Sequence, residues 1–156
     1  MSERPPAVLF VCLGNICRSP LAEAAFRAEA ERAGLRVEID SAGTGDWHVG
    51  RPPDPRAQEV ARTAGVEIAS LRARQVVTED FTRFTHIFAM DDQNLANLRA
   101  MAPAGAPARM SLLLDLVPGR EGASVSDPYH GGEELFEYTW DDVTTAARAL
   151  VAELSR

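Results

Sequence analysis

The fold is decided by residues 7–33, which read AVLFVCLGNICRSPLAEAAFRAEAERA. The short, apolar and partly β-branched run 7–11 predicts a buried strand, and the Ala, Leu, Glu and Arg content of 20–33 predicts a helix. Ser19 is a good N-cap and Pro20 suits the first helical position, so we expect the helix to begin there. The loop between strand and helix then faces the unpaired N–H groups of the helix start, which attract anions.

The loop carries a thiol, Cys12, at one end and a guanidinium, Arg18, at the other. Its five intervening residues can curl until successive backbone N–H groups converge on a phosphate-sized dianion, and Arg18 can bind two phosphate oxygens at once. In this positive field Cys12 should ionise more easily than a free thiol and attack phosphorus. The alternative is a buried cysteine and a surface arginine. We predict that five residues line the bound phosphate: Leu13, Gly14, Asn15, Ile16 and Cys17.

The stretch 11–20, VCLGNICRSP, resembles the signature loop of the low-molecular-weight protein tyrosine phosphatases. The resemblance extends along the chain through DSAGT at 40–44, PDPR at 53–56, RAR at 72–74 and DPY at 127–129. It implies a single phosphatase domain over residues 1–156 and hydrolysis of phosphotyrosine through a cysteinyl-phosphate intermediate. It also implies that Cys12 and Cys17 pair reversibly under oxidation, whereas the residues alone allow Cys17 to be a buried filler of the loop.

Composition agrees with one globular domain and excludes several enzyme classes. The chain has 156 residues, 46% of them hydrophobic, which suffice for one core. All 16 basic residues are arginine, so a Walker-type nucleotide loop and lysine Schiff-base chemistry are excluded. A formal net charge of −7 argues against a nucleic acid partner.

Neither a metal site nor a membrane segment is indicated. Two cysteines and three histidines lack the paired spacing of zinc ligands, so we predict no metal and no cofactor. Residues 1–6 lack the basic and apolar regions of a signal peptide, and no run approaches the ~20 residues of a membrane helix. We therefore expect a cytoplasmic protein.

Further strands and helices alternate along the chain. Strands are predicted at 37–40, 85–90 and 108–114, and helices at 54–64, 94–101 and from 133 or later to 154. This order predicts a three-layer α/β fold with a central, mostly four-stranded parallel sheet and helices on both faces, resembling the family. Ligands of such sheets bind beyond the carboxyl ends of the strands, where Cys12, Ser41 and Asp91 would emerge.

The departing oxygen needs a proton, which a carboxylic acid must supply. From the residues alone, Asp127 and Asp91 are near-equal candidates, because Asp-Pro is an ordinary turn signal and Asp91 follows a strand at the ligand-binding edge. Residues 92–94 can equally begin a helix. The resemblance assigns the general acid to Asp127, which would later act as the base that activates water.

Other residues are predicted to support the loop or to form the walls of the pocket. Asn15 and Ser41 should hold the loop in shape, and Ser19 should additionally contact the thiolate, although Ser41 can also be a simple turn residue. Trp47 and Tyr129, with His130 as a further candidate, would form an aromatic slot, although aromatic loop residues often merely cover the core.

The predicted partners are phosphotyrosine proteins or peptides, with inorganic phosphate as product. His130 stands where a second aromatic residue often follows the tyrosine in the family, which leaves substrate preference open. Eight acidic residues lie between Asp115 and Asp142, either disfavouring acidic peptides or forming a solvated face.

Three alternative functions stay open. An arsenate reductase of this fold would need a third cysteine, and the chain has two. A protein arginine phosphatase tends to carry threonine at the position of Ile16. A non-catalytic phosphoprotein-binding module would need no general acid.

Overall fold

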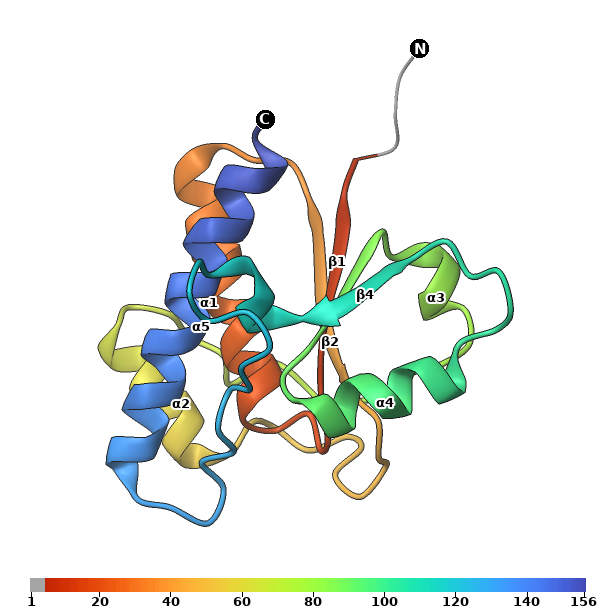
Figure 1. The fold of residues 1–156 in the computed structure, drawn as a ribbon. Coiled ribbons are helices and arrows are strands. Elements are labelled where there is room, and N and C mark those ends of the chain that lie inside the picture. The colour runs from red at the N-terminus through yellow and green to blue at the C-terminus, as the bar shows by residue number, and fades with distance from the viewer. Residues whose placement is uncertain (1–4) are drawn as a thin grey trace.

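Four parallel strands form the central sheet of this computed structural model, which describes residues 5–156 (Figure 1). Their order across the sheet is β2-β1-β3-β4. The predicted four-stranded parallel sheet is therefore confirmed. Residues 1–4, part of the N-terminal stretch in which we expect no signal peptide, lie outside the described residues. The strands are β1 (Ala7–Cys12), β2 (Glu38–Gly43), β3 (His86–Ala89) and β4 (Arg109–Leu112).

Helices cover both faces of the sheet, as predicted (Figure 1). One face packs against α1, α2 and α5, and the other against α3 and α4. A short 3₁₀ helix, η1 (Leu113–Leu116), follows β4. The helices are α1 (Arg18–Ala33), α2 (Pro55–Thr63), α3 (Asp80–Arg83), α4 (Asp92–Met101) and α5 (Glu133–Leu154).

Strand β1 lies between the two cores of the molecule. Successive strand side chains point to opposite faces, so Val8 and Phe10 enter the core beneath α1 and α5, whereas Leu9 and Val11 enter the core beneath α3 and α4. All six β1 residues are buried, which explains why the strand reads as a continuous apolar run.

The start of α1 differs from the prediction. The helix begins at Arg18, and Cys17 occupies the N-cap position without a side-chain capping bond, so Ser19 as N-cap is wrong. The Ser19 hydroxyl instead contacts the Cys12 sulfur at 3.0 Å. Ser19 is already the second residue of α1, so it lies past the N-cap position and its hydroxyl contacts the loop.

Three other segments also differ from the prediction. Strand β2 runs on to Gly43, α4 begins at Asp92, and the strand predicted at 108–114 gives way to η1 after Leu112. Helix α3 was not predicted, because four residues hold too little periodicity to be recognised.

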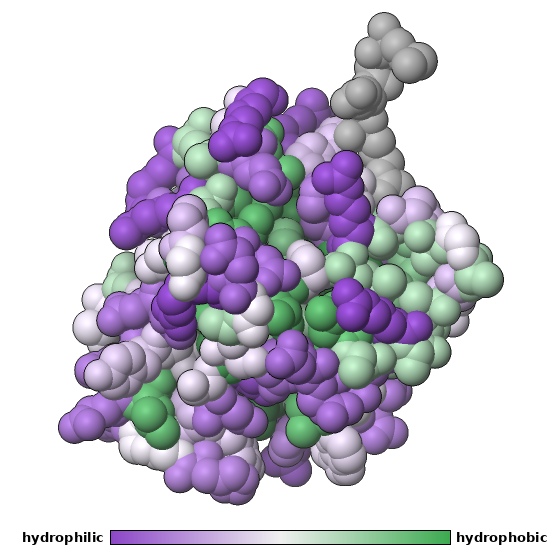
Figure 2. All heavy atoms as spheres, viewed as in Figure 1, coloured by the Kyte–Doolittle hydropathy of each residue, from purple (hydrophilic) through white to green (hydrophobic). Residues whose placement is uncertain are grey.

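The face of the molecule drawn in Figure 2 is mostly hydrophilic, with apolar residues showing between the polar ones. Within residues 5–156, no helix combines the length and the hydrophobicity that crossing a bilayer requires.

Candidate active site

The phosphate-binding loop (residues 12–18) joins β1 to α1 at the carboxyl edge of the sheet. Neighbouring segments bind its carbonyl groups from outside: Gly45 N donates to Leu13 O at 2.9 Å, and Asp54 N donates to Ile16 O at 2.8 Å. Asn15 has a left-handed backbone, with φ of 58°, and its backbone N–H donates to the Cys12 sulfur at 3.3 Å. With its carbonyls held outward, the loop can turn its amides inward, as an anion-binding nest requires.

A buried chain of hydrogen bonds holds the thiol and the loop. Asn15 Nδ2 donates to Ser19 Oγ at 2.8 Å and to Ser41 Oγ at 3.0 Å, and Ser19 Oγ lies 3.0 Å from Cys12 Sγ. The backbone amide of Arg74 donates to Asn15 Oδ1 at 3.0 Å. The structure thus brings together the three residues predicted to support the loop.

This series of hydrogen bonds ends at Glu23, whose role the sequence did not reveal. Ser41 Oγ donates to Glu23 Oε1 at 2.7 Å, and Glu23 is buried on the inner face of α1. Burial raises the pKa of this carboxyl, and the hydrogen bonds from Ser41 and Arg27 oppose the rise. A glutamate within a helical stretch of alanine and glutamate carries no local signal that distinguishes it from a solvated one.

The Arg18 guanidinium is fixed by partners from two distant segments. Its side chain is 4% exposed, and Nη1 donates to Asp91 Oδ2 at 2.8 Å and to Val125 O at 2.9 Å. Asp91 also caps α4, because its Oδ1 accepts a hydrogen bond from Asn94 N at 2.7 Å. Of the two competing carboxyls, Asp91 is therefore engaged in positioning Arg18 and in starting a helix.

Asp127 lies at the mouth of the same site. Its side chain is 50% exposed, and its Oδ2 is 3.8 Å from Arg18 Nη2. The loop that carries Asp127 is held by Arg56, whose guanidinium donates to Tyr129 O and Gly131 O, each at 2.8 Å. Asp127 thus combines contact with the site and access to solvent, as a proton donor requires.

Arg56 is itself held by Asp54, the N-cap of α2. Burial would raise the pKa of Asp54, but the hydrogen bonds and charge of Arg56 outweigh burial and keep this pKa below its ordinary value. The carboxylate therefore stays ionised, and Arg56 is fixed between α2 and the 127–131 loop. The stretch PDPR at 53–56 contains these residues, but their role depends on segments far along the chain.

A pocket of about 220 Å³ opens above the loop. Trp47, Tyr129 and His130, the residues proposed from sequence as its walls, line the pocket together with His48, which the sequence analysis did not name. The Tyr129 ring contacts both imidazoles, with its centroid 6.4 Å from that of His48 and 5.0 Å from that of His130. Trp47 is 68% exposed. The other residues that line the pocket are Cys12, Leu13, Gly14, Ile16, Cys17, Arg18 and Asp127.

Cys17 also lines this pocket, and both cysteines are free thiols. Burial raises the pKa of the Cys17 thiol strongly, and the negative groups of Asp54, Cys12 and Asp127 raise it further. Cys17 is therefore a neutral thiol near pH 7 and a poor nucleophile. Within the described residues, no group of three or more histidine, cysteine or carboxylate side chains is placed to hold a metal ion.

A thiol and a buried guanidinium in one pocket, a carboxyl at its edge and a parallel α/β fold are the features expected of the class of cysteine-dependent phosphatases. Comparison with known proteins identifies the family. The model of the low molecular weight phosphotyrosine protein phosphatases matches residues 7–156. The chain belongs to this family.

Individual proteins are similar to this chain over most of its length. The chain is 50% identical over 132 residues to a low molecular weight phosphotyrosine protein phosphatase of Schizosaccharomyces pombe, covering 83% of this chain and 84% of the relative. The crystal structure of YfkJ from Bacillus subtilis superposes with a TM-score of 0.90 at 41% identity, covering 98% of this chain and 96% of that one. A drosophila arginine phosphatase has a TM-score of 0.90 at 30% identity, covering 96% of this chain and 98% of that one.

Proposed function

We propose that the protein hydrolyses phosphotyrosine in proteins and peptides, and small aryl phosphates, to inorganic phosphate. The observation that carries the proposal is the placement of Cys12 and the Arg18 guanidinium at the base of a pocket with aromatic walls. The 50% identity to a phosphotyrosine phosphatase supports it. A phenyl ring suits an aromatic slot, and a long phosphotyrosine side chain reaches the base of a pocket where phosphoserine falls short.

In the first step the Cys12 thiolate attacks phosphorus. An S–P bond forms and the P–O bond to the phenol breaks, while the Arg18 fork and the loop amides bind the equatorial oxygens. Asp127 donates its proton to the departing phenolate. The fixed position of Arg18 between Asp91 and Val125 O keeps its donors oriented before the substrate arrives.

In the second step the Asp127 carboxylate takes a proton from water. The water oxygen attacks phosphorus, the S–P bond breaks, and the electron pair returns to Cys12 as a thiolate. The Ser19 hydroxyl, 3.0 Å from the sulfur, can donate to that thiolate. The cycle needs no cofactor. Since the nucleophile must stay a reduced thiol, we also propose a cytoplasmic location.

The reaction is tested by phosphate release from phosphotyrosine, phosphoserine and phosphoarginine peptides in the presence of a metal chelator, for the wild type and Cys12→Ser. We expect release from phosphotyrosine by the wild type and none by Cys12→Ser. Preference for phosphoarginine would instead support the arginine phosphatase alternative. No release from any peptide by the reduced wild type would support a phosphoprotein-binding module.

The role of Asp127 is tested by Asp127→Asn with leaving groups of different basicity. We expect kcat/KM, which covers only the steps up to loss of the phenol, to fall about 10²–10⁴-fold for phosphotyrosine, the range typical of a lost general acid. The loss should be much smaller for p-nitrophenyl phosphate, whose phenolate is a stable anion. Equal loss for both substrates would show that Asp127 does not protonate the leaving group.

A further inference from the structure

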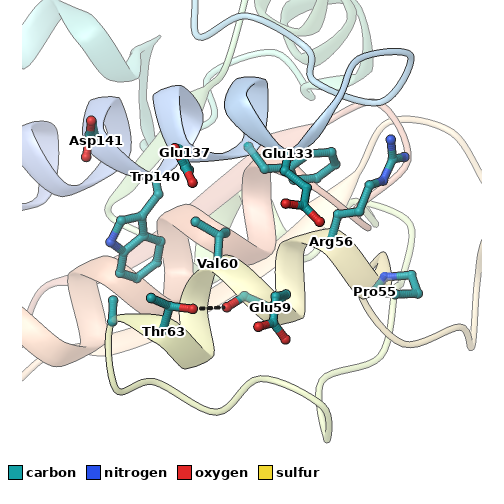
Figure 3. Close-up of a pocket in the computed structure, with 11 residues that line it drawn as sticks. Pro55, Arg56, Glu59, Val60, Thr63, Glu133, Glu137, Trp140 and Asp141 are labelled. Atoms are coloured by element: carbon teal, nitrogen blue, oxygen red, sulfur yellow. Dashed lines mark hydrogen bonds between the residues drawn. The ribbon is translucent and has the colours of Figure 1, made fainter.

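A second cavity, of about 570 Å³, lies between α2 and α5 and is called here the α2–α5 groove. Its apolar surface comes from Val60 on α2 and from Phe136 and Trp140 on α5. Phe136 is buried and Trp140 is half-buried, so part of the indole faces the cavity. Figure 3 shows Trp140 extending from α5 toward α2, with Val60 rising between the two helices.

Carboxylates surround this apolar surface. Glu133, Glu137 and Asp141 of α5 line the groove, and so does Glu59 of α2. Within residues 5–156, none of the three α5 carboxylates forms an ion pair, whereas Glu59 pairs with Arg62 at 3.3 Å. The groove thus offers uncompensated negative charge beside an aromatic ring.

The groove already holds one guanidinium of the chain itself. Arg56 lies at one end, with its Cζ 4.6 Å from the centroid of the Phe136 ring. Its donors are used by Asp54 and by the carbonyls of Tyr129 and Gly131. This contact shows that the groove accepts a planar cation on an aromatic face.

Trp140 repeats the aromatic position of Phe136 one helical turn further along α5. Indole is the best aromatic partner for a cation. No arginine among the described residues lies over Trp140, although Glu137 and Asp141 flank it in sequence and line the same groove. The groove therefore has a second aromatic ring that no arginine of the described residues covers, with carboxylates that form no ion pair beside it.

We propose that the α2–α5 groove binds an arginine side chain of a basic segment in a substrate protein. The proposal rests on the phosphotyrosine phosphatase function proposed above. Arg56 lies between the groove and the wall of the active site, because the carbonyl that it binds belongs to Tyr129. One substrate can therefore place phosphotyrosine in the pocket and a basic segment in the groove, and the second contact raises the effective concentration of the first.

Binding is tested with a dye-labelled hexapeptide of alternating arginine and glycine, without phosphate, by fluorescence anisotropy at low salt. We expect saturable binding to the wild type, weakened at least tenfold in Glu133→Gln/Glu137→Gln and in Trp140→Leu. The matched control Glu31→Gln/Glu153→Gln makes the same charge change on exposed positions elsewhere and should bind as the wild type does. Absence of binding, or equal weakening in both double variants, would overturn the proposal.

Measurements of turnover test the groove proposal separately from the proposed phosphatase function. An arginine-bearing extension on a phosphotyrosine peptide should raise kcat/KM several-fold in the wild type and not in Glu133→Gln/Glu137→Gln. Turnover of p-nitrophenyl phosphate should be the same in both proteins, since this substrate does not reach the groove. Hydrolysis of phosphotyrosine without any effect of the extension would refute the groove proposal alone. Peptide binding without hydrolysis of any phosphoester would refute only the phosphatase function.

Discussion

Asp91 makes two contacts that a single substitution can separate. Its Oδ1 caps α4 through Asn94 N, and its Oδ2 accepts from Arg18 Nη1. Asparagine is as good an N-cap as aspartate, so Asp91→Asn can keep the cap. It removes the charge that holds Arg18, and a buried guanidinium that loses its partner becomes less well oriented.

For Asp91→Asn we therefore expect kcat/KM for phosphotyrosine peptide to fall by about 10–30-fold, equivalent to ~1.4–2 kcal/mol, since Asp91 is partly exposed. The affinity for the competitive inhibitor phosphate should fall in parallel. Asp92→Asn removes an exposed charge one residue away and serves as the matched control. If both variants lose activity equally, Asp91 does not act through Arg18.

Glu23 gives the stability of the protein a defined pH dependence. Burial raises the pKa of Glu23, so in the folded protein its carboxyl stays protonated above pH 4.5, its ordinary pKa. In the unfolded chain the same carboxyl has lost its proton at these pH values. The contribution of Glu23 to stability is therefore complete below pH 4.5 and is lost as the pH rises through the raised native pKa.

Glu23→Gln cannot ionise, yet its amide oxygen can still accept the hydrogen bond from Ser41. We expect the free energy of unfolding of this variant to increase relative to that of the wild type as the pH rises from 4.5 to 8. Urea unfolding at several pH values measures this difference. A difference that does not change with pH would show that Glu23 has the same pKa in the folded and the unfolded state.

The site could be predicted from sequence where it is local. Cys12 and Arg18 share one loop, and the structure places both in the pocket. Asp91 and Glu23 could not be assigned their contacts, because the Arg18–Asp91 bond joins residues 73 positions apart and the Ser41–Glu23 bond joins residues 18 apart. Such partners depend on how strands and helices are arranged, which no short pattern encodes.

At the scale of elements, β2 shows why boundaries were less accurate than the order of the strands. Ser41, Ala42 and Gly43 have the composition of a turn, yet they continue the strand because they pair with β1, Cys12 opposite Gly43. Long-range pairing overrides local preference here. By contrast, α5 agrees with its predicted bounds because its 22 residues carry a sustained helical pattern.

Arg56 connects α2 to the loop that carries Asp127 and Tyr129. In Arg56→Ala the 127–131 loop loses two hydrogen bonds and should become more mobile. We expect kcat/KM for phosphotyrosine peptide to fall about tenfold, since misplacing the Asp127 acid and the Tyr129 wall reduces stabilisation of the transition state. Hydrogen exchange of residues 127–131 should accelerate in the same variant.

Arg62→Ala is the control for this prediction, because Arg62 lies on the same helix and, within residues 5–156, pairs only with the exposed carboxylates of Glu59 and Glu67. Faster exchange in the 127–131 loop of both variants would mean that α2 as a whole is loosened. Unchanged exchange and activity in Arg56→Ala would contradict the connection.

At the scale of the whole molecule, the two cores share one strand. Val8 and Phe10 belong to one core, and Leu9 and Val11 to the other, so neither core can lose β1 without disrupting its neighbour. The prediction of a single domain over the whole chain accordingly implies one cooperative unfolding transition. The phosphate-binding loop follows directly from this shared strand, so ligand binding in the loop should stabilise the whole fold.

Inorganic phosphate, the product of the proposed reaction, provides the test. It should bind only the folded loop, and at 100 times its Kd such a ligand stabilises the native state by about 2.7 kcal/mol. For a chain of 156 residues this corresponds to a rise in Tm of about 5–10 °C in a single calorimetric transition. Cys12→Ser keeps the loop amides and Arg18 and should show the same rise. Arg18→Lys keeps the charge but loses the planar fork, so its rise should be much smaller. Two separate transitions, of which phosphate moves only one, would mean that the cores unfold independently and that β1 does not couple them.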